Sequence, residues 1–306
     1  MPVLRPEERV GTVIGGRYRI DEIIGSGGMG VVYSGAHTWT ERPVAVKVLS
    51  VEHLEEERAV RRFFQEAKTA AKLHHPSVVD VLDMGETRDG APFLVLELLT
   101  GESLLARVMR GPMPVHDAVA FVLPLMDALA TAHAVGIIHR DIKPANLFLH
   151  VAAKGNVVPK LVDFGISKLM GTNVSMPTAT GTLIGTPHYM SPEQIAAAKT
   201  ISGQTDVWSM GVVLFEALAG RRPFEGQIPL AVVVKISTEA APPLREVASH
   251  VPEPIADAVD GALKKNLPER HADMPAFIDA LLAGARASGI EVVDPRHVHA
   301  SIPPPE

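Results

Sequence analysis

The sequence contains no cysteine, so disulfide bonds and thiolate metal sites are excluded and a reducing compartment is permitted. It also lacks an excess of positive charge, because 29 Lys and Arg stand against 35 Asp and Glu. A chain with this balance has no electrostatic feature that favours nucleic acid or an anionic membrane surface. We therefore expect a cytoplasmic protein with no nucleic-acid partner.

Long apolar runs are missing as well. The longest apolar runs, such as residues 211–215, are far shorter than the roughly 20 residues that a membrane-spanning helix needs. Residues 1–10 are charged and lack the apolar centre of a secretory signal. These patterns predict a soluble chain without membrane insertion.

The length of 306 residues suits one large two-lobed domain or two ordinary ones. Residues 1–16 combine prolines, charges and a terminal pair of glycines, and they predict a lead-in with little structure of its own. Residues 286–306 end in three prolines and a glutamate, and they predict a mobile tail. The domain itself is expected over residues 17–285.

A glycine-rich stretch, Gly25-Ser26-Gly27-Gly28-Met29-Gly30, interrupts two β-like segments near the start of this domain. Without Cβ atoms, such a loop can close over phosphates. The same letters occur in dinucleotide-binding fingerprints, but those require a helix directly after the glycines. Here residues 31–33 and 43–49 continue as strands, which favours a phosphate-covering hairpin over a dinucleotide site. A plain hairpin remains the structural alternative.

Lys47 lies among apolar residues in the strand predicted at 43–49, and a lysine drawn inward needs a partner. Residues 56–73 show apolar side chains at helical spacing, with Glu66 at the margin of the apolar stripe. A helix packed on the strands through that stripe would tip Glu66 toward them. The pattern predicts a Lys47–Glu66 pair.

The block of residues 139–146 contains Asp141, Lys143 and Asn146, and a second acid, Asp163, follows further along. A carboxylate can accept a proton from a hydroxyl, and a lysine can neutralise a transferring phosphoryl group. Asn and Asp oxygens suit a hard cation. This combination points to phosphoryl transfer, against the simpler alternative of a polar surface loop.

These residues match the H-R-D-x-x-x-x-N and D-F-G signatures, and the sequence resembles the eukaryotic-type Ser/Thr protein kinases, most of all the bacterial ones. Residues 44–47 resemble the V-A-I-K block, and residues 191–193 resemble A-P-E with Ser191 in place of Ala. The resemblance implies an α+β, bilobal protein kinase fold. Its small antiparallel β lobe, with one main helix, would span about 17–99, and its large, mostly helical lobe about 100–285.

The resemblance also implies roles for individual residues. Asp141 would be the catalytic base, Lys143 the cation near the γ-phosphate of ATP, and Asn146 with Asp163 the ligands of Mg²⁺ or Mn²⁺. Lys47 and Glu66 would position the phosphates. The nucleotide would contact Ile24, Gly25, Ser26, Gly27, Gly28, Met29, Gly30, Val32, Ala45, Lys47, Leu96, Glu97, Leu99 and Phe148.

The Thr-rich stretch after Asp163 resembles an activation segment. By that resemblance Thr178 and Thr180 would be autophosphorylated, with Arg140 and Lys168 holding the phosphates. Thr186 would bond near Asp141 and Lys143. Glu193 and Arg270 would form a buried pair that anchors the end of the segment.

The expected activity is therefore transfer of the γ-phosphoryl group to Ser/Thr hydroxyls of protein substrates and of the chain itself, with homodimerisation left open. Three alternatives compete: a catalytically weak scaffold or nucleotide-binding module of the same fold, a small-molecule phosphotransferase, and a dinucleotide oxidoreductase. Intact Lys47, Glu66, Asp141, Asn146 and Asp163 oppose the first. The activation segment opposes the second, and the strand after the glycines opposes the third.

Overall fold

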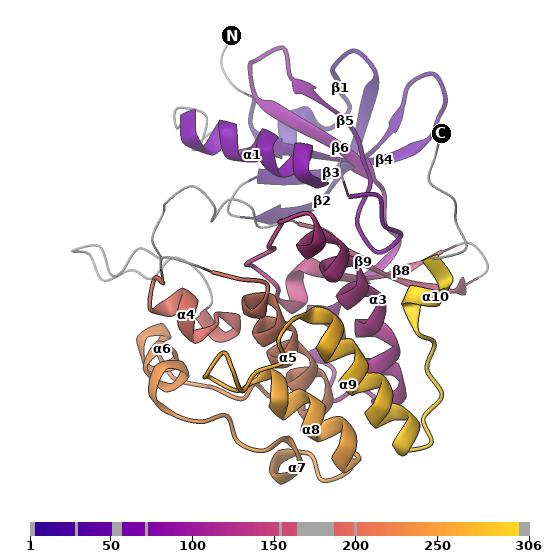
Figure 1. Ribbon diagram of the computed structural model, residues 1–306. Coiled ribbons are helices and arrows are strands. Elements are labelled where there is room, and N and C mark those ends of the chain that lie inside the picture. Colours follow the sequence, from indigo (N-terminus) through magenta and orange to yellow (C-terminus); the bar gives the residue numbers. More distant parts are fainter. Residues whose placement is uncertain are drawn as a thin grey trace. The chain divides into compact units, whose positions relative to one another are not determined.

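A computed structural model describes residues 4–27, 30–50, 57–70, 73–152, 155–163, 187–198 and 201–299. The chain divides into two compact units, a small unit of residues 1–100 and a large unit of residues 101–306 (Figure 1). One is built on an antiparallel sheet with one α-helix, and the other is mostly helical. The predicted α+β fold class is confirmed.

The small unit holds a six-stranded antiparallel sheet in the order β1-β2-β3-β4-β6-β5. Along residues 43–49, valines alternate with Ala45 and Lys47, so this strand presents two different faces. One face contributes a core with Tyr33, Val46, Phe93 and Val95 at its centre. The elements are η1 (Pro6–Arg9), β1 (Val13–Ile14), β2 (Tyr18–Gly27), β3 (Gly30–His37), β4 (Pro43–Leu49), α1 (Glu57–Ala70), β5 (Val81–Glu86) and β6 (Pro92–Glu97).

The other face of this sheet is covered by α1, which contacts β5 and β6 (Figure 1). Phe63 and Ala67 of the helix pack with Leu94 and Leu49 of the sheet. This is the arrangement that the apolar stripe predicted.

The expectation of an unstructured lead-in over residues 1–16 is wrong for the described part of that stretch. Arg9 is the last residue of the 3-10 helix η1 and forms a buried ion pair with Asp89, with Nη2 2.7 Å from Oδ2. The same carboxylate accepts the backbone N–H of Leu4, and Pro6 accepts the hydroxyl of Tyr33. Val13 and Ile14 then pair with β2. A charge pair between residues 80 apart cannot be recognised from local composition.

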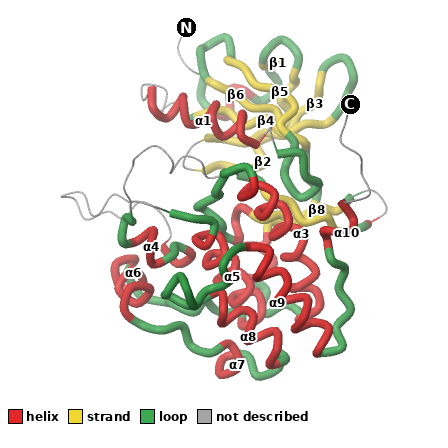
Figure 2. Tube along the Cα trace, viewed as in Figure 1, coloured by secondary structure: helices red, strands yellow, loops and turns green. Residues whose placement is uncertain are grey.

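The large unit is an assembly of helices with a small sheet in the order β7-β8-β9. Its helices α3, α5, α8 and α9 pack against one another (Figure 2). The elements are β7 (Gly101–Ser103), α2 (Leu104–Val108), α3 (Val115–Ala134), η3 (Pro144–Asn146), β8 (Leu147–Val151), β9 (Val157–Leu161), η6 (Pro187–Tyr189), α4 (Pro192–Ile195), α5 (Gln204–Ala219), α6 (Pro229–Thr238), α7 (Leu244–Val247), α8 (Glu253–Ala262), α9 (Met274–Ala287) and α10 (Pro295–His299).

Helix α3 is buried on most of its surface rather than along one stripe, with Phe121, Leu125 and Leu129 all inaccessible or nearly so. It is also the one described helix long and apolar enough to cross a membrane, and 56% of the tested window is buried inside the unit. A core helix meets the same criteria, so this finding is weak evidence for a span. Polar residues interrupt the apolar sequence of this helix, so it contains no long uninterrupted apolar run.

The last described residues differ from the expected tail. Helix α10 contacts α3, and Arg296 bridges Asp279 of α9, with Nη1 2.9 Å from Oδ1. Arg296 also bonds Asp294, whose pKa is lowered by that hydrogen bond. The five residues of this helix carry no apolar periodicity, so no sequence pattern predicts it.

Candidate active site

The loop before η3 brings together three of the residues singled out in the sequence. Lys143 Nζ lies 2.8 Å from Asp141 Oδ2, and Asn146 Nδ2 donates to the same oxygen at 3.2 Å. Asn146 Nδ2 also donates to the backbone carbonyl of Asp141 at 2.8 Å. Asp141 and Lys143 are partly exposed, whereas Asn146 is buried. The loop therefore exposes the carboxylate of Asp141 and the ammonium group of Lys143, while the buried side-chain amide of Asn146 holds the backbone of Asp141 in place.

A second acid, Asp206, fixes the start of this loop from the first turn of α5. Its Oδ2 accepts the backbone N–H of His139 and its Oδ1 that of Arg140, both at 2.8 Å. Its Oδ2 also lies 2.8 Å from Nε2 of His133, at the end of α3. Asp206 is fully buried. Asp206 therefore holds the backbone at the start of the loop, and His133 in turn contacts the Asp206 carboxylate.

His139 is a buried, uncharged part of the same loop. Burial lowers its pKa, although the carboxylates of Asp206, Asp141 and Asp163 act in the opposite direction. Its Nδ1 accepts the backbone N–H of Asp141 at 3.3 Å, which requires that nitrogen to be unprotonated. His139 therefore supports the conformation of the loop and is not a proton carrier.

Asn146 and Asp163 are the predicted metal ligands. Because the amide nitrogen of Asn146 is engaged by Asp141, its oxygen is the atom left to face a cation. Asp163 is exposed and follows β9, which pairs with β8 directly after Asn146. Within the described ranges no cluster of three or more His, Cys, Asp or Glu could hold a metal ion. Two hard oxygen donors suit Mg²⁺, which usually completes its octahedral coordination with waters and substrate phosphates.

Several candidate nucleotide residues of the small unit lie on one face of its sheet. Gly25, Val32, Lys47 and Leu94 are successive cross-strand partners from β2 to β6. Residues directly opposite one another point to the same face. Ala45, two residues before Lys47 and opposite Leu96, shares that face. This is the face that α1 covers at Leu94.

The glycine stretch is more regular than its sequence suggested. Gly25, Ser26 and Gly27 belong to β2, and Gly27 pairs with Gly30 at the start of β3. Gly30 approaches β4 so closely that an added Cβ would lie 2.3 Å from the carbonyl oxygen of Val48. Ile24 is 48% exposed. Gly28 and Met29 lie outside the described residues.

Several other predicted residues can be placed only in part. The backbone N–H of Glu97 donates to Asp80, so a contact from Glu97 to a nucleotide would have to use its carbonyl. Leu96 and Leu99 are half-buried in the small unit, and Phe148 is half-buried in β8 of the large unit. Glu66 lies in α1, but its side chain is outside the description, as are Lys168, Thr178, Thr180 and Thr186 entirely.

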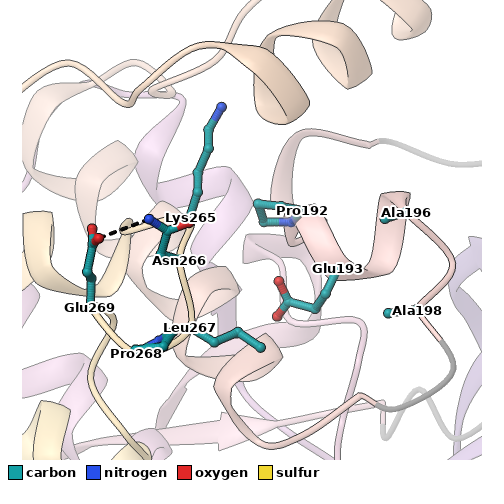
Figure 3. A pocket seen from close by; sticks show the side chains of 9 residues that line it. All are labelled: Pro192, Glu193, Ala196, Ala198, Lys265, Asn266, Leu267, Pro268 and Glu269. Atoms are coloured by element: carbon teal, nitrogen blue, oxygen red, sulfur yellow. Dashed lines mark hydrogen bonds between the residues drawn. The ribbon is translucent and has the colours of Figure 1, made fainter.

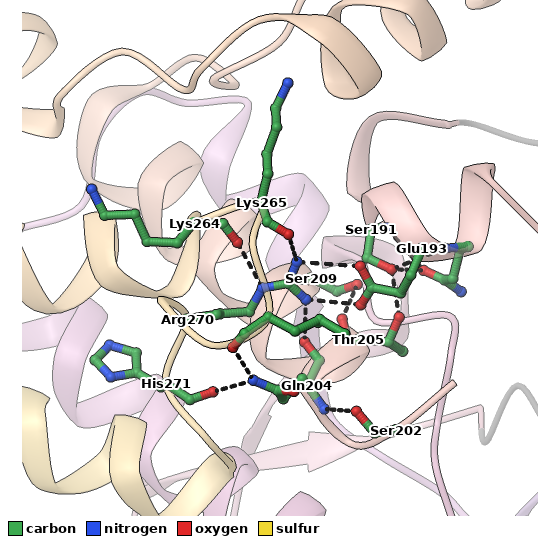
Figure 4. A network of polar contacts seen from close by, with 12 residues as sticks. Ser191, Glu193, Ser202, Gln204, Thr205, Ser209, Lys264, Lys265, Arg270 and His271 are labelled. Atoms are coloured by element: carbon green, nitrogen blue, oxygen red, sulfur yellow. Dashed lines mark hydrogen bonds and ion pairs between the residues drawn. The ribbon is translucent and has the colours of Figure 1, made fainter. Parts of the chain in front are cut away.

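The pair predicted between Glu193 and Arg270 is present. Nη1 of Arg270 lies 2.8 Å from Oε1 of Glu193, and Nη2 lies 3.2 Å from Oε2 (Figure 4). Arg270 is buried, and its remaining N–H groups reach backbone carbonyls of Lys264, Gln204 and Lys265. The prediction of a buried bidentate pair is confirmed.

Beside this pair lies a surface pocket of about 590 Å³ (Figure 3). Leu267, Pro268 and Lys265 line one part of it, and another part is lined by Pro192 and Glu193 of α4 and by Ala196 directly after that helix. None of these residues belongs to the loop of Asp141. We assign the pocket no part in phosphoryl transfer, because it contains no acid–lysine pair of the kind at Asp141.

The chain is similar to a family model and to several proteins of known class. Residues 18–281 match the family model described as "Protein kinase domain". The chain is 34% identical over 285 residues to "Serine/threonine-protein kinase pkn3" of Myxococcus xanthus, a match that covers 92% of this chain and 51% of that protein. It is 37% identical over 280 residues to "Serine/threonine-protein kinase PknA" of Mycobacterium tuberculosis, covering 90% of this chain and 63% of the relative.

Among solved structures, the "Mycobacterium tuberculosis PknI kinase domain" matches with a TM-score of 0.68 and 25% identity. That match covers 93% of this chain and all of the solved one. The chain thus spans about half to two thirds of the length of these two curated relatives and the full length of an isolated catalytic domain.

Proposed function

The chain belongs to the protein kinase domain family, and from this membership we propose that it transfers the γ-phosphoryl group of ATP to Ser and Thr hydroxyls of protein substrates. The observation that carries the proposal is the loop of Asp141, Lys143 and Asn146, whose polar groups meet within hydrogen-bond distance. The relatives in Myxococcus xanthus and Mycobacterium tuberculosis are Ser/Thr kinases by name.

Asp141 is proposed as the base that orients the acceptor hydroxyl and takes its proton. Its carboxylate is partly exposed, as contact with a substrate requires, and its backbone is held by Asn146 and His139. Lys143, bonded to Oδ2 in the structure, would turn toward the transferring phosphoryl group as its negative charge approaches. The lysine thereby stabilises charge that grows in the transition state.

The metal proposal rests on donor chemistry. Asn146 Oδ1 and the Asp163 carboxylate would hold Mg²⁺, with Mn²⁺ as the alternative, and nucleotide phosphates would supply further oxygens. A cation held by these two residues would supply positive charge that neutralises the phosphate oxygens. The fixed amide nitrogen of Asn146 is what presents its oxygen for this role.

For ATP itself, the proposal uses the sheet face that carries Val32, Ala45 and Lys47. Lys47 and Glu66 would form the pair that positions the α- and β-phosphates. The other proposed nucleotide contacts are Ile24, Gly25, Ser26, Gly27, Gly28, Met29, Gly30, Leu96, the carbonyl of Glu97, Leu99 and Phe148. Apolar side chains in contact with a flat base exclude water, and recognition is then left to backbone groups.

Regulation by phosphorylation is a further part of the proposal. Thr178 and Thr180 would be modified by the chain itself, and Arg140 with Lys168 would bind the added charge of about −1.5 to −2 per phosphate. Thr186 would bond near Asp141 and Lys143 instead. Mass spectrometry after incubation with Mg²⁺ and ATP tests this directly. Unmodified Thr178 and Thr180, or full activity of a Thr178→Ala, Thr180→Ala double variant, would contradict it.

We further propose that the protein acts in cytoplasmic signalling without nucleic acid or membrane insertion, and that a homodimer is compatible with its activity. The net charge of −6 supports the absence of a polyanion surface. A catalytically weak scaffold is the less favoured alternative. The contacts among Asp141, Lys143 and Asn146 are those that catalysis requires, and a scaffold would not need them.

The experiment that tests the proposed function combines the chain with Mg²⁺, ATP and a mixed peptide library rich in Ser and Thr. Mass spectrometry then identifies every phosphorylated residue. The proposal predicts phosphate on Ser and Thr only. Phosphate on small molecules but not on any peptide would identify a different phosphotransferase, and ATP binding with no transfer would identify a scaffold.

A further inference from the structure

Arg140, the residue before the proposed base, has an unusual backbone. Its φ is +65°, in the left-handed region that side chains with a Cβ rarely adopt. Such a conformation persists only where neighbouring groups determine it. The orientation of Asp141 therefore depends on the contacts that hold the peptide groups around Arg140.

Three of these contacts have been described above. Asp206 accepts the N–H of Arg140, His139 accepts the N–H of Asp141, and Asn146 donates to the carbonyl of Asp141. The remaining group is the carbonyl of Arg140, which shares a peptide plane with the N–H of Asp141. Its partner is Gln194, whose Nε2 donates to it at 2.9 Å.

Gln194 is 5% exposed, and its amide is oriented by contacts at both ends. Its Oε1 accepts the backbone N–H of Ser191 at 3.0 Å, at the N-terminus of α4. A backbone N–H can only donate and a backbone carbonyl can only accept, so the oxygen must face Ser191 and the nitrogen Arg140. Gln194 also lines the small hollow of about 10 Å³ that Asp141 and Lys143 line.

We propose that Gln194 is a positioning residue for phosphoryl transfer, which holds the Arg140–Asp141 peptide plane and thereby aims the Asp141 carboxylate. The inference rests on the proposed function of Asp141. Of the four contacts, Gln194 supplies the one that comes from α4, the helix that Glu193 anchors to Arg270. The position of the Asp141 carboxylate thus depends on the position of α4, because the side-chain amide of Gln194 connects the two.

Sequence alone indicates only half of this role. Ser191 and Gln194 have the spacing of a capping box, and the structure contains that box. A capping glutamine would be explained completely by its bond to Ser191. The bond across 54 residues to Arg140 is visible only in the fold.

The test uses a substitution that separates the two bonds. Gln194→Glu keeps an oxygen toward Ser191 but replaces the donor facing Arg140 with a second oxygen. Gln194→Met, of similar length, removes both bonds and serves as a second variant. Ser191→Ala is the matched control, because it weakens the cap of α4 and leaves the amide of Gln194 within reach of Arg140.

For each variant, kcat on a Ser/Thr peptide and KM for ATP are measured, with kcat expressed per folded molecule as determined by circular dichroism. We expect Gln194→Glu and Gln194→Met to lower kcat roughly tenfold, the scale of one lost hydrogen bond in the transition state, with KM for ATP within about twofold. Ser191→Ala should lower thermal stability and leave kcat per folded molecule unchanged.

A kcat per folded molecule within about twofold of wild type in both Gln194 variants would overturn the inference and leave Gln194 as a capping residue. An equal loss in Ser191→Ala would overturn it too, because the cap would then account for the effect. Absence of transfer by the wild-type chain is a separate result, since it would remove the proposed function on which the inference rests.

Discussion

Arg270 donates two hydrogen bonds, of 2.8 and 3.2 Å, to the carboxylate of Glu193, 77 residues away in the sequence. Its guanidinium also lies 5.1 Å from the centroid of the Trp208 ring. Three backbone carbonyls accept further hydrogen bonds from it (Figure 4). Every side of this charge is therefore satisfied by the protein. The pair fixes α4 to the helical core through the loop that precedes α9.

Removing the arginine should be costly. Arg270→Ala leaves the largely buried carboxylate of Glu193 without a partner, which is typically worth about 3 to 5 kcal/mol of unfolding free energy. We expect a clear fall in the thermal midpoint and in the urea midpoint. Arg245→Ala is the matched control, because Arg245 forms an exposed pair with Glu253. Equal small effects from both substitutions would contradict the buried pair.

The pair of Glu193 and Arg270 also predicts that the stability of the fold depends on pH. Burial raises the pKa of Glu193, but the hydrogen bonds and charge of Arg270 outweigh burial and hold the pKa below its ordinary value of 4.5. A carboxylate with a lowered folded pKa stabilises the fold above its unfolded pKa, and this contribution disappears as pH falls through the folded value. The stability difference between wild type and Arg270→Ala should therefore shrink below about pH 4.5. A difference that grows in acid would contradict the assignment.

The buried ion pair between Arg9 and Asp89, called here the Arg9–Asp89 clamp, predicts that the start of the chain stabilises the small unit. The carboxylate of Asp89 accepts both terminal nitrogens of Arg9, the hydroxyl of Thr87 and the N–H of Leu4. Arg9→Ala should lower the unfolding free energy by on the order of 3 kcal/mol, because one buried charge loses its partner.

Arg5→Ala provides the comparison for this clamp, since Arg5 pairs with Glu8 on the exposed side of the same turn. The unfolding free energy of both variants is measured in urea, with amide hydrogen exchange in β5 and β6 as the common readout. If Arg9→Ala were no more damaging than Arg5→Ala, the described N-terminal segment would not be holding the sheet.

The sequence could predict much of this fold because its signals are local. Alternating valines predicted β4 at its observed bounds, and apolar spacing predicted α1 within a few residues. The loop of Asp141 was recognised because the residues that must meet are only a few positions apart. Even Glu193 and Arg270 could be paired, but only through family resemblance and not through any pattern of their own.

The features that sequence could not predict depend on long-range geometry. The Arg9–Asp89 clamp and the Gln194–Arg140 bond join residues that share no periodicity. The left-handed backbone of Arg140 had no signal either, because glycine and not arginine normally marks that conformation. In each case a buried polar group finds a partner that only the tertiary structure brings near.

Lys47 and Glu66 should behave as one unit in catalysis. Lys47 shares its sheet face with Leu94, against which Phe63 and Ala67 of α1 pack on either side of Glu66 in sequence. Lys47→Met and Glu66→Gln should each lower kcat/KM severely, and the double variant should lose little more than either one. Lys68→Met, an exposed change on the same helix, is the control. Additive losses in this cycle would contradict the pair.

The central claim is that Asp141 is the base of a Ser/Thr phosphoryl transfer, and a single substitution tests it. Asp141→Asn keeps the size of the side chain and oxygen-acceptor capacity for Lys143 and Asn146, but it removes the group that accepts the proton. Turnover on a Ser/Thr peptide is measured beside ATP affinity, with the exposed Asp117→Asn of α3 as control. Proton-transfer groups contribute about 10²- to 10⁴-fold, so we predict a loss of at least about 100-fold in kcat with ATP affinity nearly unchanged. A loss of less than about tenfold would show that Asp141 is not the base.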